Sequence, residues 1–141
     1  MIQKKLPLTI FTTIALFFCS QTKAQLFISS ATFFIQPGAT VTVQGNITSN
    51  TAIQGTGLVV LNGTSNQTVD MGGFAIPNLQ INNAANATLL SNLLISDSLY
   101  LTSGKITLGS NNLTLAAAAG TVGGGIGTFI ETNSTGQAVK D

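Results

Sequence analysis

Apolar and polar residues alternate in short triplets along the chain, and the clearest series ends at Leu115. The three triplets, at intervals of seven residues, are Leu99-Tyr100-Leu101, Ile106-Thr107-Leu108 and Leu113-Thr114-Leu115. The connections between them, TSGK and GSNN, are rich in the residues that turn a chain sharply. Alternation places the apolar side chains of each strand on one face. The pattern predicts short strands that form the sides of a coil, each pairing with its counterpart one coil above.

A second, longer period in the sequence agrees with the first. Similar triplets begin at Leu58, Leu79 and Leu99, at intervals of 21 and 20 residues, close to the 21 residues of three seven-residue sides. Thr40-Val41-Thr42-Val43 and Thr88-Leu89-Leu90 supply further sides. Agreement between the local and the long-range period predicts an all-β fold, a short single-stranded β-solenoid or parallel β-helix of about five coils. We expect the many asparagines to serve as corner residues or as hydrogen-bonded ladders between coils.

Residues 1–24 are typical of a secretory signal peptide. Lys4-Lys5 precedes an apolar run over 6–18, and a small residue, Ala24, closes the polar stretch that follows. A membrane anchor is the alternative, but a spanning helix needs about twenty apolar residues. We therefore expect cleavage after Ala24, export through the Sec pathway, and no membrane span in the mature protein.

The segment over 25–141 is long enough for one domain. The pattern predicts a solenoid domain over 25–118, with an apolar N-terminal cap at 26–36, and a Gly/Thr-rich C-terminal segment over 119–141 with one further strand. No comparable cap follows at the C-terminal end. We expect the chain to be the N-terminal piece of a longer protein, or its last coil to be covered by another chain. Self-association through the uncapped C-terminal coil follows from the same argument, because exposed strand edges recruit other chains.

Composition excludes several chemistries. The segment after Ala24 contains no cysteine, histidine, tryptophan or arginine, and its two lysines and four acids give a net charge of −2. The absence of histidine excludes serine-histidine catalysis. A zinc site of the usual kind is excluded because the segment has neither imidazole nor thiolate ligands. With only two lysines the segment has no basic patch for a nucleic-acid backbone. We predict no cofactor, no metal site, no nucleic-acid partner and no enzymatic activity. A polysaccharide-active enzyme is a distant third reading, since the internal acids Asp70, Asp97 and Glu131 do not match the spacing of one coil.

A binding face is the alternative to a purely structural role. Tyr100 lies between two leucines that should point inward, so its ring should face outward, where an aromatic side chain can contact a carbohydrate. Rows of threonine, to which Thr107 and Thr114 would belong, could match a carbohydrate or an ice lattice. The candidate ligand face is therefore Tyr100, Thr107 and Thr114, for a surface glycan or protein partner.

Four segments of the chain resemble a known class of repeats. GTGLVVLNGTSNQTV from Gly55, NLQINNAANATLL from Asn78, the Leu99–Leu115 run and TFIETNSTGQAVK from Thr128 are similar to β-strand repeat segments of large secreted surface proteins of Bacteroidota. The resemblance implies an adhesin-like, non-enzymatic protein at the cell surface or secreted, and export by the type IX system. Members usually end in a C-terminal sorting domain, and the absence of one before Asp141 agrees with the expectation of a longer parent protein. Asp97-Ser98-Leu99 also resembles the short O-glycosylation motif of Bacteroidota, with Ser98 as the acceptor.

Overall fold

A computed structural model describes residues 23–141, so residues 1–22, and with them most of the expected signal peptide, lie outside the described region. The described residues form fifteen β-strands and no helix. Most strands have two to four residues; β8 and β10 are longer. They are β1 (Leu26–Ile28), β2 (Phe33–Ile35), β3 (Thr40–Val43), β4 (Ile47–Ser49), β5 (Ile53–Gly55), β6 (Leu58–Leu61), β7 (Gln67–Asp70), β8 (Ala75–Asn82), β9 (Ala87–Leu89), β10 (Leu93–Ser103), β11 (Ile106–Thr107), β12 (Leu113–Leu115), β13 (Gly120–Gly123), β14 (Ile130–Glu131) and β15 (Ala138–Lys140).

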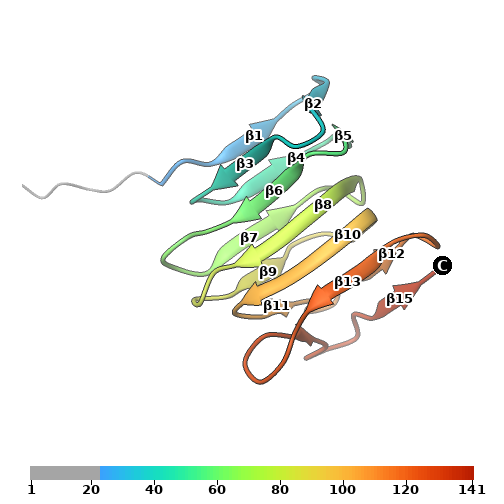
Figure 1. Ribbon diagram of the computed structural model, residues 1–141. Coiled ribbons are helices and arrows are strands. Elements are labelled where there is room, and N and C mark those ends of the chain that lie inside the picture. Colours follow the sequence, from blue (N-terminus) through green and yellow to red (C-terminus); the bar gives the residue numbers. More distant parts are fainter. Residues whose placement is uncertain (1–22) are drawn as a thin grey trace, which may run out of the picture.

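The strands lie on three sides of one shaft. The first side is the six-stranded sheet β1-β4-β7-β9-β11-β14. The second side consists of β2, β5, the beginnings of β8 and β10, β12 and β15; β5 and β8 are in contact there but do not pair. The third side consists of β3, β6, the ends of β8 and β10, and β13. Figure 1 shows the third side as the front ladder, descending from the blue N-terminal end toward the red C-terminal end.

The chain passes the three sides in order five times and then adds the first two sides of a sixth turn. Every named strand pair is parallel. The predicted all-β solenoid of about five coils is thus confirmed. The turns lengthen toward the C-terminal end. Thr107 and Glu131, neighbours across the last turn, are 24 residues apart, farther than Ser30 and Asn50, which are neighbours across the first turn.

The core is a stack of aliphatic side chains along the shaft. In β10, Leu99 is fully buried and Leu101 is 8% exposed, while Tyr100 between them points outward, as the alternation predicts. The largest completely buried side chains are Ile47, Leu61, Met71, Ile76, Leu79, Ile81, Leu89, Leu93, Ile95, Leu99, Ile106 and Leu108. The first four turns contribute buried residues from all three sides, whereas in the fifth turn the third-side strand, β13, contributes none.

The pairing register of β6 differs from the expectation by one position. Leu79 pairs with Val59 and not with Leu58, so this turn is one residue shorter than the spacing of the two leucine-led triplets suggests. The run from Leu58 to Leu61 is apolar at all four positions and therefore fits inward in either frame. The neighbouring strands decide the frame, because Leu61 pairs with Val43 on β3 and with Ile81 on β8, and all three side chains are buried.

Side chains of asparagine join consecutive turns at the corner between the first and second sides. The Asn50 Oδ1 accepts from the Ser30 amide at 2.7 Å, and the Asn92 Oδ1 accepts from the Asn112 amide at 2.8 Å. Asn112 in turn accepts from the Gln137 amide at 3.0 Å. These bonds satisfy backbone donors that a turning chain cannot give to a ladder. The expected role of asparagine as corner and ladder residue is confirmed.

The corner between the third and first sides contains a buried polar network. The Gln67 Oε1 accepts from the Gly63 amide at 2.7 Å and from the Asn83 side chain at 2.9 Å. Its Nε2 donates to the Val43 carbonyl at 2.9 Å and also to that of Gly45. Gln67 and Asn83 are each 1% exposed. One turn below, Gly104 has φ +74° and a Cβ there would lie 1.9 Å from the Asn83 carbonyl oxygen, so only glycine fits.

The two ends of the stack have strands that pair on one side only. The segment 26–36, for which we expect a cap, contributes β1 and β2, the first two sides of the first turn, and each pairs only with the strand of the second turn. Phe27 and Phe34 are 70% and 59% exposed, which corrects the expectation that they belong to a cap or core. Both occupy the outward position of a strand whose inward positions are taken by Ile28 and Ile35.

We expect Gln67→Leu to destabilise the protein by about 3 kcal/mol, because the substitution leaves several buried donors and acceptors without partners. Gln80→Leu is the matched control. Gln80 lies outward on the third side, half-exposed, and its only side-chain bond goes to the exposed Thr102 hydroxyl, so its loss should change stability by less than about 0.5 kcal/mol. Urea unfolding followed by circular dichroism measures both; equal midpoints for the two variants would contradict the assignment.

Candidate functional site

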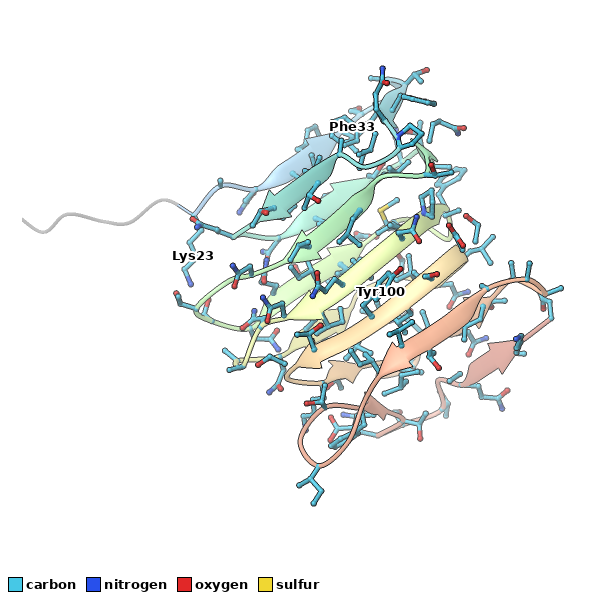
Figure 2. All side chains as sticks on the ribbon, in the orientation of Figure 1. Lys23, Phe33 and Tyr100 are labelled. Atoms are coloured by element: carbon cyan, nitrogen blue, oxygen red, sulfur yellow. The ribbon has the colours of Figure 1, made fainter. Side chains whose placement is uncertain are left out.

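Tyr100 and Ser98 lie on the outer surface of the third side, in adjacent rows. Tyr100 pairs with Gln80 above and Val122 below, and Ser98 pairs with Asn78 and Gly120. Because side chains at alternate strand positions share a face, Tyr100 and Ser98 both point outward. Figure 2 shows Tyr100 on the sheet that faces the viewer, near the middle of the stack.

The two side chains line one groove with a volume of about 470 Å³. The groove follows the start of the third side across four turns, and its wall is mostly polar. Its lining includes Thr40, Thr56, Leu58, Asn78, Asp97, Ser98 and Tyr100. The structure therefore brings together Tyr100 and Ser98, which the sequence singled out for separate reasons.

Local backbone features place Asp97 and Asn78 at this groove. β8 passes the corner between the second and third sides at Pro77, while β10 needs one more residue and bulges between Ile95 and Ser98. The bulge holds Asp97 exposed at the rim. Asn78 is only 7% exposed and its Nδ2 donates to the Thr56 carbonyl at 3.0 Å, which fixes the side-chain amide in the groove wall.

Thr107 and Thr114 do not join Tyr100 in one face. Thr107 is on β11 of the first side and Thr114 on β12 of the second side, so the three candidate residues occupy three different sides. Thr107 does belong to an outward row of three threonines, because Thr68 pairs with Thr88 and Thr88 with Thr107. Strand spacing sets the interval in this row at about 4.8 Å.

The internal acids are dispersed over the surface. Asp70 is on the first side, Asp97 is at the corner of the second and third, and Glu131 is on the first side three strands below Asp70. Three strand spacings separate Asp70 and Glu131 by at least about 14 Å. Paired carboxylates of glycosidases stand about 5 to 9.5 Å apart. Within residues 23–141, no three residues among His, Cys, Asp and Glu form a group that could hold a metal ion.

Glu131 fastens the incomplete sixth turn to the fifth. Its carboxylate accepts from the Lys105 Nζ at 2.5 Å and from the Thr107 hydroxyl at 2.8 Å. The hydrogen bond from the Lys105 ammonium, followed by that from Thr107, lowers the pKa of the Glu131 carboxyl below its ordinary value. The Lys105 Nζ also lies 5.9 Å from the centre of the Phe129 ring, at the outer limit of a cation–π contact.

A second hollow, which the sequence did not reveal, lies between the first and second sides. Phe27 from the first turn and Phe74 from the third both line it, together with Thr48, Asn50 and Asp70. These residues are far apart in sequence and share no motif. The only available signal was the occurrence of phenylalanine at outward positions, which is visible only once the strand frames are fixed.

The lowered pKa of Glu131 gives a pH-dependent attachment of the last turn. A carboxyl with a depressed pKa in the folded state stabilises that state above its ordinary pKa, and this contribution is lost as the pH falls through the folded value. We expect amide exchange at β14 to accelerate below about pH 4.5, the ordinary value, relative to exchange in the core strands. In Glu131→Gln the β14 amides should already exchange fast at neutral pH, and their exchange should change little further in acid. If acid did not accelerate β14 exchange in the unmodified protein, this assignment would be contradicted.

Among the described residues there is no helix of the length and apolar character that a membrane crossing requires. Comparison of the chain with known proteins finds no matching protein-family model, no matching curated protein and no matching solved structure.

Proposed function

We propose that this protein is a non-enzymatic structural module, exported to the cell surface or secreted, in which a rigid β-solenoid spaces or presents other groups. The observation that carries the proposal is the stack of five complete turns, in which parallel ladders surround one continuous aliphatic core. Such a stack resists bending, and its outer rows of threonine, asparagine and serine supply a hydrated surface. An adhesive role toward a surface glycan or protein fits the same architecture.

The dispersed acids support the non-enzymatic part of this proposal. Catalysis needs several groups that converge on one point. Among residues 23–141, Asp97 is the one carboxylate in its groove, and no lysine lines that groove. The Glu131 carboxylate is engaged by Lys105 and Thr107. In the described part of the chain, neither environment offers a second carboxylate, and Lys105, the one basic partner, is already bound to Glu131. A polysaccharide-active enzyme is therefore the least supported of the three readings.

The position of Ala24 bears on export. The Ala24 carbonyl accepts from the Gly45 amide at 2.8 Å, and the next residue but one, Leu26, donates to the Asn46 carbonyl at 2.9 Å. The bond that a signal peptidase would cut, after Ala24, thus packs against the second turn once the protein is folded. Cleavage must then occur before the first turn docks, and water replaces the Ala24 carbonyl as partner of the Gly45 amide.

We expect the exported protein to begin at Gln25. Expression with the native leader in a Gram-negative host, followed by N-terminal sequencing of the exported chain, measures this directly. Ala24→Arg should block processing, because signal peptidases require a small residue at this position, whereas Gln25→Ala should be processed normally. An unprocessed chain retained in the cytoplasm, in the unmodified protein, would overturn the proposed location. The intact mass of the same material also reports whether Ser98 carries a sugar.

A carbohydrate-binding groove is the second candidate function. The observation in its favour is that Tyr100, Asp97 and Ser98 line one groove on the third side. A ring face for stacking and a carboxylate for hydroxyl groups are the elements that sugar recognition uses. The ice-binding variant of this reading would use the row Thr68, Thr88 and Thr107, which is one residue wide and ends at the Glu131 ion pair.

Self-association is part of the proposal, with a second copy as the partner. The first and second sides have six strands and the third has five, so the C-terminal end presents β13, β14 and β15, each paired on one side only. Nearby apolar side chains are exposed, including Val122, Ile126, Phe129 and Val139. At the other end β1, β2 and β3 contain no charged residue. Charged side chains are the usual protection of an exposed strand edge, so this end lacks that protection. Contact between the C-terminal end of one copy and the N-terminal end of another would join two unlike surfaces, so further copies could keep adding to the assembly.

We expect the weight-average mass of the chain from Gln25 to rise with protein concentration in light scattering. Ala138→Lys places a charge in the inward row of the last turn, beside Leu113, and should restore the monomer mass because a charge cannot be buried in the junction. Thr64→Lys, in an exposed loop of the middle turns, is the control and should associate like the unmodified protein. A constant monomer mass at the highest concentration reached would contradict self-association.

A further inference from the structure

The hollow between the first and second sides differs in chemistry from the Tyr100 groove. It has a volume of about 360 Å³ and a mainly apolar wall, at the lower end of the range for small-ligand sites, about 300 to 1,000 Å³. Two phenylalanine side chains line it while remaining 70% (Phe27) and 44% (Phe74) exposed. Single exposed apolar residues are ordinary on a protein surface, but two at one concave site indicate a binding surface.

One wall of the hollow is an outward row that crosses three turns. Phe27 on β1 pairs with Thr48 on β4, and Thr48 pairs with Asp70 on β7. The three side chains therefore stand in line at strand spacing, about 4.8 Å per step. An aromatic ring, a hydroxyl and a carboxylate thus follow one another over about 10 Å, on a backbone whose position is fixed by the ladder.

The other wall is held by a tight turn after β7. Gly72 and Gly73 have φ values of +59° and +87°, and the Phe74 amide donates to the Met71 carbonyl at 2.9 Å. The Ser91 hydroxyl of the next turn accepts from the amides of both Met71 and Gly72 at 2.8 Å. The Phe74 ring is consequently presented by a rigid corner, and its exposure does not arise from a loose loop.

The carboxylate at the rim is oriented for a ligand. The Asp70 Oδ1 is the second, longer acceptor of the Gly72 amide, at 3.3 Å against 2.8 Å for the Ser91 hydroxyl, and its Oδ2 has no hydrogen bond within the described residues, so the carboxylate can accept from a ligand. Asn50, also in the lining, is fixed by its bond from the Ser30 amide. A site with prepositioned groups loses less conformational entropy on binding than a flexible one.

We propose that this hollow binds one or two saccharide rings, with Phe27 and Phe74 as stacking surfaces and Asp70 and Thr48 as hydrogen-bond partners of sugar hydroxyls. A pyranose combines an apolar C–H face with hydroxyl donors at its edge, which matches an aromatic wall beside a carboxylate. The hollow is then a saccharide site separate from the Tyr100 groove. The inference rests on the proposed role at the cell surface, where glycans are the abundant partners.

A glycan array probed with the labelled chain from Gln25 to Asp141 tests this proposal, and affinities for the best glycan follow by calorimetry. Phe27→Ala and Phe74→Ala should each weaken binding at least about tenfold, the loss of one stacking contact. Asp70→Asn should weaken it as well, since an amide is the poorer acceptor. Phe27 and Asp70 stand in an outward strand row, so these two variants should keep the unfolding midpoint of the parent, and circular dichroism confirms that Phe74→Ala is folded before its affinity is compared.

Two control variants make the result specific. Phe34→Ala removes an equally exposed phenylalanine, 59%, that lies on the second side outside the hollow, and it should bind like the parent. Tyr100→Ala should also bind like the parent. Loss of binding in Tyr100→Ala alone would move the site to the third-side groove and overturn the inference. Binding of no glycan on the array would overturn it too. Neither result bears on export, which the N-terminal sequence of the secreted chain decides separately.

Discussion

The parallel, in-register pairing of each turn with the next is the constraint on which the rest of the structure depends. A three-residue strand is too short to hold its shape alone, and its backbone groups are satisfied only by the turns above and below. Pairing in register then fixes which residues point inward. Val43, Leu61 and Ile81 meet in one buried column on the third side, and equivalent columns fill the shaft on the other two sides. The ladder and the buried columns therefore specify the same register.

Corners complete this arrangement because they carry the backbone groups that ladders cannot satisfy. At one corner exposed asparagine side chains accept from amides of the neighbouring turn. At another the buried Gln67 and Asn83 side chains donate to carbonyl groups of the neighbouring turn, away from water. The difference in burial has an energetic meaning. An exposed asparagine can be replaced by water, whereas the Gln67 network has no substitute. Stability of a chain without disulfides after Ala24 thus depends on a few buried amides as well as on aliphatic packing.

The sequence predicted the class of fold because period and alternation are properties of neighbouring residues. It could not predict the frame of β6, since Leu58 to Leu61 is apolar throughout and only the pairing with β3 and β8 distinguishes the two frames. The outward position of Tyr100 followed from Leu99 and Leu101 on either side. The exposure of Phe27 and Phe34 did not follow, because LFI and FFI triplets are apolar at all three positions and read equally well as core.

A binding site on such a surface is a column of outward side chains, one from each turn. Its residues are therefore about twenty positions apart in the sequence and form no local motif. Phe27, Thr48 and Asp70 contribute to one wall although each comes from a different turn. A turn that alternates in and out leaves its outward positions free of packing constraints, so a substitution there alters the column without altering the ladder. Binding chemistry can therefore accumulate one residue per turn on a fold that stays unchanged. The independence of outward positions also limits what the sequence can predict. The local alternation shows that Thr107 and Thr114 point outward, but the side of the solenoid on which each lies depends on the length of every preceding turn.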